Sequence, residues 1–239
     1  IEADLTIMRL AADRFYIVTG SGFGVRDAGW IRKHLPADAS LREVTSERAV
    51  IAVVGPRSRE VLSQLSDDDL SNEAFPHFTV REIEIGLAPV RAVRVGYVGE
   101  LGWELHIPVE YAAHVYDLLI EAGRPFGIAD AGYRAIESLR LEKGYVYWGA
   151  EVGPEIDPYT AGLGFAVALD KGPFVGRDAL KRLAAAGPER RLCTFAVEGW
   201  APLHGGEPIL HQGRVIGTTS SAGYGHTLGR TIALGYVPA

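Results

Sequence analysis

Cysteine and long apolar runs are scarce in this sequence, and each scarcity narrows the class of protein. Cys193 is the single cysteine, so no disulfide can form within the chain, as is typical of a reducing compartment. No stretch of about 18 apolar residues occurs, and the N-terminus lacks the basic flank of a signal peptide. We therefore predict a soluble protein without a membrane partner, located in the cytoplasm, or in the mitochondrial matrix if the source is eukaryotic.

Runs of basic residues are also absent. The 24 basic and 30 acidic residues are spread along the chain and give a formal net charge of -6. Nucleic acid needs a clustered basic surface, so we exclude it as a partner. The seven histidines are scattered, and none has the spacing of a zinc site. The acidic group Glu151, Glu155 and Asp157 lacks the spacing of a calcium loop, so we predict a solvated loop there and no metal.

The apolar pattern predicts a mixture of strands and helices, of α+β type. Period-two alternation predicts a hairpin over residues 5–10 and 15–19, a strand over 49–54 and a second hairpin over 78–95. Helical spacing predicts helices over residues 26–35, 57–65, 108–122 and 133–145. From residue 190 onward the pattern changes to short strands, at 192–197, 206–210, 215–220 and 231–237. They indicate a separate small β domain.

The most informative segment is Arg94–Leu105, which reads RVGYVGELGWEL. A strand ends, glycines allow a tight turn, and a second strand begins with a phenol and a carboxylate close by. Glu104 stands between Trp103 and Leu105, so alternation places it on the opposite face of that strand, either in solvent or in a pocket. Solvent is the more common environment for an isolated glutamate in a strand.

This segment resembles a turn found in glycine-cleavage T-proteins and in the C-terminal parts of dimethylglycine and sarcosine dehydrogenases. Further blocks are similar in order and spacing: residues 132–144 with SLRLEKG, residues 157–165, residues 169–180, and the terminal block 213–229. Nearly the whole chain therefore resembles the aminomethyltransferase family. The resemblance is closest to the folate-binding part of the two dehydrogenases.

The resemblance implies a cloverleaf fold around a folate channel. It places a folate-binding region at residues 1–187 and part of a small β-barrel-like domain at residues 188–239, with the boundary in the stretch AAAGP at residues 184–188. The sequence begins with Ile1 instead of methionine and stops directly after a strand-like run. We therefore expect a fragment of a larger enzyme, truncated at both ends.

The resemblance also implies four site residues and one cofactor. Asp4 is the catalytic carboxylate, which orients the reduced pterin of tetrahydrofolate and accepts a proton. Glu104 binds the amino group and ring N–H of the pterin. Tyr97 and Thr6 line the same pocket, although packing within the strands is an equally good explanation for these two. FAD is expected only in a domain upstream of this chain.

One departure distinguishes the branches of the family. T-proteins carry an Ala-Arg-Asp triplet whose arginine meets folate, whereas this sequence has Ala135-Ile136-Glu137. The missing arginine favours a dimethylglycine or sarcosine dehydrogenase-like flavoenzyme. Arg134 lies nearby, but a solvated helix arginine is an equally good interpretation.

The reaction implied is transfer of a one-carbon unit to tetrahydrofolate, giving 5,10-methylenetetrahydrofolate. The expected partners are folate and a small one-carbon donor derived from a methylated amine. Two alternatives stay open: a glycine-cleavage aminomethyltransferase with a lipoyl carrier protein as donor, and a non-catalytic folate-binding assembly factor.

Overall fold

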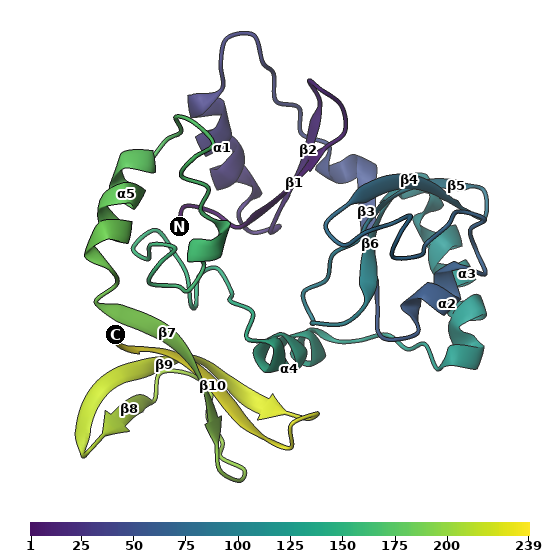
Figure 1. Cartoon of the computed structure of the whole chain (residues 1–239). Coiled ribbons are helices and arrows are strands. Elements are labelled where there is room, and N and C mark those ends of the chain that lie inside the picture. Colours follow the sequence, from purple (N-terminus) through teal and green to yellow (C-terminus); the bar gives the residue numbers. More distant parts are fainter. The chain divides into compact units, whose positions relative to one another are not determined.

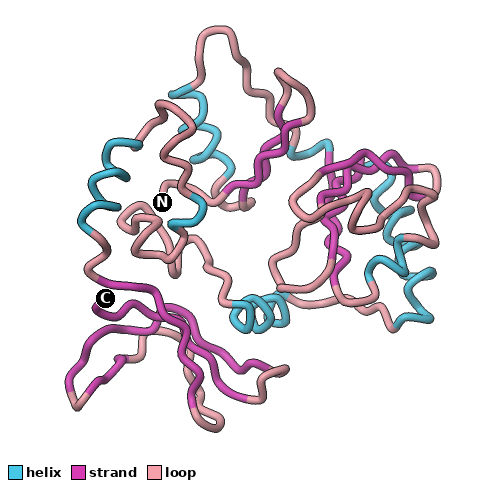
Figure 2. Tube along the Cα trace, viewed as in Figure 1, coloured by secondary structure: helices cyan, strands magenta, loops and turns pink.

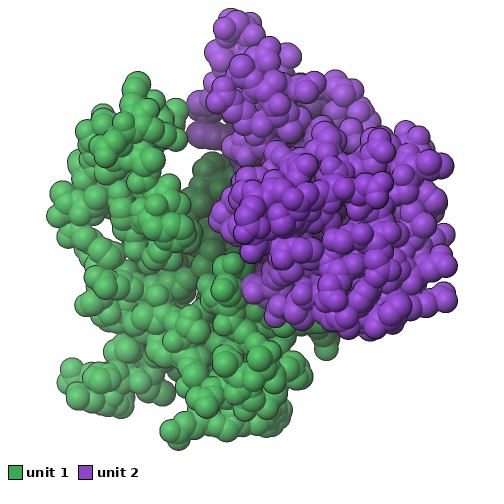
Figure 3. All heavy atoms as spheres, turned by 45° about the vertical axis from the view of Figure 1, so that its right-hand side comes forward, with its two compact units in different colours: residues 1–4, 133–239 green, residues 5–132 purple.

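The computed structural model describes residues 1–239 and divides them into two compact units (Figure 3). Unit 1 comprises Ile1–Asp4 and Tyr133–Ala239, and unit 2 comprises Leu5–Gly132. Each unit contains helices and antiparallel sheet, so the expected mixed fold class is confirmed (Figure 1). None of the helices combines the length and apolar character needed to cross a bilayer.

Unit 2 is built on a four-stranded antiparallel sheet with strand order β3-β6-β5-β4. The strands are β3 (Arg48–Val54), β4 (Val80–Ile85), β5 (Ala88–Val93) and β6 (Gly102–Pro108). The predicted hairpin over residues 78–95 is confirmed as β4 and β5. Its turn is short, because Gly86 takes a φ of 58° and lets the chain reverse before Ala88.

One face of this sheet forms the core of unit 2. The short helix α2 (Ser58–Leu62) and the longer α3 (Ala112–Gly123) contribute Leu62, Val115 and Leu119 to the same buried cluster as Trp103 and Leu105 of β6. Burying such large side chains contributes roughly 1.5–3 kcal/mol each. Because side chains alternate along a strand, the other face of β6 is left for Glu104 and its same-face neighbours.

A two-stranded hairpin and a helix open unit 2. Strands β1 (Leu5–Arg9) and β2 (Phe15–Thr19) pair antiparallel, as predicted, with Thr6 opposite Val18 and Met8 opposite Tyr16. These four side chains share one face of the hairpin. Helix α1 (Gly24–His34) follows and begins two residues earlier than expected. Its buried Asp27 accepts a hydrogen bond from the Thr19 hydroxyl, which ties the helix to β2.

Unit 1 contains the C-terminal antiparallel sheet, with strand order β7-β10-β9-β8. Its strands are β7 (Arg190–Val197), β8 (Pro208–His211), β9 (Arg214–Gly225) and β10 (Arg230–Pro238). All four strands predicted in this region are therefore confirmed. Strand β9 is longer than expected because glycines let it lie close to β10: a Cβ on Gly217 would stand 2.0 Å from the carbonyl oxygen of Tyr236.

Two helices complete unit 1. Helix α4 (Tyr133–Lys143) packs on β9, and α5 (Arg177–Ala186) precedes β7. The chain between α4 and α5 consists mainly of loops (Figure 2). Helix α5 ends at the start of the Gly187-Pro188 stretch. The domain boundary expected there stays a prediction, since the division into compact units falls between Gly132 and Tyr133.

Glu207 fastens the loop that leads into β8. Its carboxylate accepts hydrogen bonds from the backbone N–H groups of His204 at 2.7 Å and Gly205 at 3.0 Å, and from the Thr219 hydroxyl at 2.6 Å. These donors, the His204 N–H first, lower the pKa of Glu207 to about 2. The loop therefore gains stability at pH values above the usual glutamate pKa near 4.5, and loses it as the pH falls towards 2.

We predict that Thr219→Val raises the pKa of Glu207 part of the way back towards 4.5, because the hydroxyl donor is lost while the two backbone donors remain. Carboxyl carbon shifts followed by NMR over a pH titration measure this change. Thr218→Val on the same strand is the control, and it should leave the titration of Glu207 unchanged. An equal shift in both variants would contradict the assignment.

Candidate functional site

Glu104 projects from the face of β6 opposite to the core. Its side chain is 29% exposed, whereas Trp103 and Leu105 on either side are fully buried. In the sheet it lies between Ala52 of β3 and Val93 of β5. The predicted orientation of Glu104 is confirmed. Its carboxylate stands near the middle of the sheet, where a rigid strand holds its backbone and solvent or a ligand can still reach it.

His106 stands next to Glu104 on the same face of β6 and is fully buried. Its Nε2 atom lies 3.7 Å from Oε2 of Glu104, and its Nδ1 atom lies 3.3 Å from the hydroxyl of Tyr16. The rings of Tyr16 and His106 meet edge to face, with centroids 5.4 Å apart. The face of the hairpin that carries Tyr16 is thereby joined to the face of the sheet that carries Glu104.

His106 was not among the predicted site residues. The spacing Glu104-x-His106 does indicate that both side chains lie on one face of a strand. The spacing cannot show that the histidine is buried, or that a tyrosine 90 residues earlier in the chain meets it. Those two facts depend on the hairpin β1–β2 lying near β6.

Tyr16 borders a cavity of about 370 Å³ within unit 2. The guanidinium of Arg91 lies 4.8 Å from the centre of the Tyr16 ring and pairs with Glu82 at 2.6 Å. Burial raises the pKa of Tyr16, although Arg91 and Arg48 act in the opposite direction. The phenol is consequently protonated at neutral pH and can donate a hydrogen bond. Basic side chains surround the cavity: Arg14, Arg42, Arg48 and Arg91.

Thr6 and Tyr97 lie in the same unit as Glu104. Thr6 is half-buried in β1, on the hairpin face that also carries Met8 and Tyr16. Tyr97 is half-buried in the segment that joins β5 to β6, the predicted glycine-rich turn. A half-buried position fits contact with a ligand and packing within the strands equally. Their contact with a ligand stays a prediction.

Asp4 directly precedes β1 and is exposed. The segment before β1 is held within unit 1, because the Ile1 nitrogen donates to the carbonyl oxygen of Gly153 at 2.8 Å and Trp148 Nε1 donates to the carbonyl oxygen of Ile1 at 3.0 Å. These hydrogen bonds fix the backbone three residues before Asp4. Its catalytic role stays a prediction.

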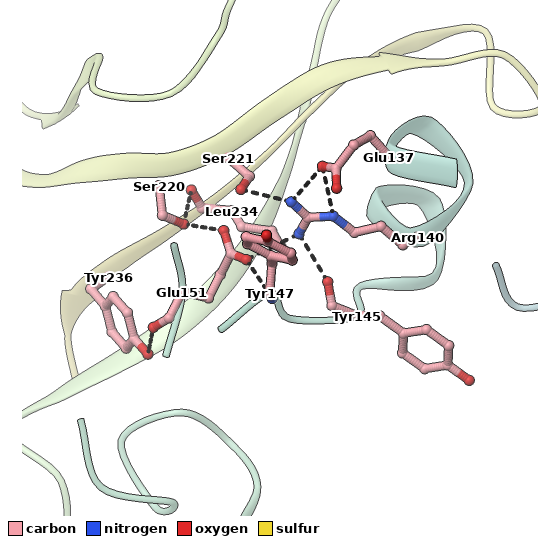
Figure 4. A network of polar contacts seen from close by, with 9 residues as sticks. All are labelled: Glu137, Arg140, Tyr145, Tyr147, Glu151, Ser220, Ser221, Leu234 and Tyr236. Carbon is pink, nitrogen blue, oxygen red and sulfur yellow. Dashed lines mark hydrogen bonds and ion pairs between the residues drawn. The ribbon is translucent and has the colours of Figure 1, made fainter. Parts of the chain in front are cut away.

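The expectation of a solvated acidic loop at residues 151–157 is wrong for Glu151. This side chain is fully buried in unit 1. Its carboxylate pairs with Arg140 of α4 at 3.0 Å and accepts hydrogen bonds from the Tyr147 N–H at 2.8 Å and the Ser220 hydroxyl at 2.7 Å (Figure 4). Glu155 is exposed, in keeping with the expectation.

Arg140 is as deeply buried as its partner. Besides Glu151 it binds Glu137 at 2.8 Å, the Ser221 hydroxyl at 2.8 Å and the Tyr145 carbonyl oxygen at 3.0 Å (Figure 4). Glu137 belongs to the triplet in which this sequence departs from T-proteins, and here it is an ion-pair partner one helical turn before Arg140. The network joins α4, the following loop and β9. It serves to hold unit 1 together.

Asp157, the third acidic residue of that group, forms hydrogen bonds with residues close to it in the chain. Its carboxylate accepts hydrogen bonds from the backbone N–H groups of Tyr159 at 2.8 Å and Thr160 at 3.0 Å, and from the Thr160 hydroxyl. Burial acts to raise the pKa of Asp157, but these hydrogen bonds outweigh it and lower the pKa overall. The carboxylate thus closes the turn in which it lies.

Comparison with known proteins shows which families and solved structures this chain resembles. The model of the GCVT N-terminal domain family matches residues 1–171, and that of the glycine cleavage T-protein C-terminal barrel domain matches residues 190–239. The crystal structure of glycine cleavage system aminomethyltransferase T from Bartonella henselae superposes with a TM-score of 0.86 at 28% identity, covering 100% of this chain and 64% of that one. The T-protein fold expected from the sequence is confirmed.

Two curated relatives belong to the dehydrogenase branch. Human mitochondrial sarcosine dehydrogenase is 39% identical over 99% of this chain, and human mitochondrial dimethylglycine dehydrogenase is 36% identical over 100% of it. The chain spans 28% of the length of each. The resemblance noted in the motifs is confirmed by these matches along the whole sequence. The chain belongs to the aminomethyltransferase, or glycine-cleavage T-protein, family, and it is related to sarcosine and dimethylglycine dehydrogenases.

Proposed function

We propose that this chain binds tetrahydrofolate and transfers a one-carbon unit to it, forming 5,10-methylenetetrahydrofolate. The observation that carries the proposal is Glu104, a partly exposed carboxylate in the middle of a sheet whose other face carries the hydrophobic core of unit 2. The pterin ring of folate presents an amino group and a ring N–H side by side. A carboxylate can accept a hydrogen bond from each at once, one per oxygen.

The four expected site residues have different roles in this proposal. Glu104 holds the pterin through its donor edge, while Thr6 and Tyr97 contribute to the walls of the pocket. Asp4 acts at the reacting nitrogens of folate. A carboxylate there attracts the cationic carbon of an iminium donor and can accept a proton in the transfer step.

The transfer balances with one proton released. N5 of tetrahydrofolate attacks the iminium carbon, and N10 then displaces the amine from that carbon, so that the carbon ends bonded to both nitrogens. Each nitrogen loses the hydrogen it carried. The leaving amine takes one proton, and Asp4 accepts the other before passing it to solvent. No oxidation or reduction occurs in this step.

The donor that we favour is an iminium derived from a methylated amine, as in a dimethylglycine or sarcosine dehydrogenase-like flavoenzyme. Two observations support this choice: the folate-facing arginine of T-proteins is replaced by Ile136, and the sarcosine and dimethylglycine dehydrogenases match over the whole chain. FAD would then be held by a different part of such an enzyme. The iminium would be the product of amine oxidation there.

An aminomethyl group on a lipoyl carrier protein is the alternative donor, as the fold shared with an aminomethyltransferase of the glycine cleavage system allows. The two donors can be told apart directly. Product formation is measured with tetrahydrofolate and either an aminomethylated lipoyl carrier protein or an iminium formed from glycine and formaldehyde. Turnover with the carrier alone would overturn our choice of donor.

Replacing Glu104 by alanine is expected to weaken tetrahydrofolate binding about 10- to 100-fold, because at least one hydrogen bond to a charged group is lost. Isothermal titration under anaerobic conditions measures the affinity. The matched control is Glu100→Ala, which removes an exposed carboxylate four residues earlier and should change the affinity less than twofold. Unchanged affinity in Glu104→Ala would show that Glu104 does not bind the pterin.

A further inference from the structure

The buried imidazole of His106 has one nitrogen without a hydrogen-bond partner. Nε2 is shielded from solvent, and Oε2 of Glu104 lies 3.7 Å from it. A buried polar atom left unpaired costs about 1–3 kcal/mol, so an unpaired one in a folded protein calls for a reason. In the proposed function, the neighbouring Glu104 is the residue that binds the pterin.

The hydroxyl of Tyr16 is placed to select the tautomer of His106. It lies 3.3 Å from Nδ1 and can donate its hydrogen to that nitrogen. When the hydroxyl donates to Nδ1, a neutral imidazole must hold its own hydrogen on Nε2. That N–H is then on the side of the ring that faces Glu104. Both Tyr16 and His106 are held by packing, as the edge-to-face contact of their rings shows.

We infer that His106 is a positioning residue which, fixed by Tyr16, holds one oxygen of Glu104 and so sets the carboxylate in the orientation that the pterin requires. This inference rests on the proposed function. Glu104 is partly exposed, and without a partner its side chain could rotate among several rotamers. A bidentate contact with two fixed donors requires a single one of these rotamers. Binding would shorten the 3.7 Å separation to hydrogen-bond length, since such contacts tighten when the ligand is present.

The arrangement gives the burial of His106 a role in the site. An N–H on Nε2 can support the carboxylate from the buried side, and the exposed part of Glu104 stays available to the ligand. Arg91 lies 4.8 Å from the centre of the Tyr16 ring, and it is already paired with Glu82. In metal sites, residues that orient a ligand in this way change the affinity by about 10- to 100-fold when they are replaced.

The test compares three replacements of His106 and Tyr16 in the binding of tetrahydrofolate. His106→Phe keeps an aromatic ring but removes both nitrogens, and we expect about a 10-fold loss of affinity. His106→Gln keeps an N–H near the position of Nε2 and should recover most of that loss. Tyr16→Phe removes only the hydroxyl that fixes the tautomer and should weaken binding two- to fivefold. Circular dichroism and thermal unfolding of each variant establish that it is folded.

A double-mutant cycle shows whether His106 acts through Glu104. In a Glu104→Ala background, His106→Phe should cause no further loss of affinity. A further loss of about 10-fold there, or failure of His106→Gln to bind better than His106→Phe, would show that the histidine matters only for packing. If His106→Phe left the affinity intact while Glu104→Ala reduced it, this inference would fall and the proposed function would stand. If the unaltered chain bound no tetrahydrofolate, the proposed function itself would fall.

Discussion

Replacing Arg140 by methionine is expected to lower the free energy of unfolding by about 3–5 kcal/mol, because the substitution leaves the buried carboxylate of Glu151 without its cation. Methionine fills most of the space of the arginine stem, so the loss reports the missing charge more than a cavity. Chemical denaturation followed by circular dichroism measures the change. The loss should appear in the transition that involves α4 and the C-terminal sheet.

Arg134→Met is the matched control for Arg140→Met. Arg134 lies on the same helix but is exposed, and its replacement should change the free energy of unfolding by no more than about 0.5 kcal/mol. The double variant Arg140→Met with Glu151→Gln should be more stable than Arg140→Met alone, because the uncompensated charge is removed. A double variant no more stable than the single one would show that the loss has another origin.

Replacing Asp4 by asparagine is expected to slow the formation of 5,10-methylenetetrahydrofolate by about 10²- to 10⁴-fold, the usual contribution of a positioned acid or base. Asparagine keeps the size of the side chain but can neither accept the proton nor attract a cationic carbon. Affinity for tetrahydrofolate should fall much less than the rate, since Glu104 holds the pterin. Single-turnover measurements with an iminium donor separate the rate of transfer from binding.

Asp13→Asn is the control for Asp4→Asn. It neutralises an exposed carboxylate in the turn between β1 and β2, and we expect it to leave the transfer rate unchanged. An undiminished rate in Asp4→Asn would show that Asp4 is not the reacting carboxylate. Tetrahydrofolate binding by the unaltered chain with no transfer from either donor would favour the remaining alternative, a non-catalytic folate-binding assembly factor.

Local patterns were sufficient for most of the helices and strands. The hairpin β1–β2, the hairpin β4–β5 and the four C-terminal strands all lie where alternation and turn residues predicted them. Alternation also assigned Glu104 to the face of β6 opposite Trp103 and Leu105, as the structure confirms. These features depend on residues close together in the chain, whose geometry the backbone period fixes. The ordered motifs were long enough to indicate the family.

Contacts between residues distant in the sequence could be identified only in the folded chain. Glu151 was expected in solvent because the acidic group to which it belongs lacks the spacing of a metal site, yet Arg140 of α4 and Ser220 of β9 enclose it. Likewise nothing near His106 in the sequence indicates Tyr16, which lies 90 residues earlier. A residue's type and spacing settle its secondary structure and the face on which it lies. Its burial and hydrogen-bond partners are settled only when sheets and helices pack, because packing joins segments that no local pattern relates.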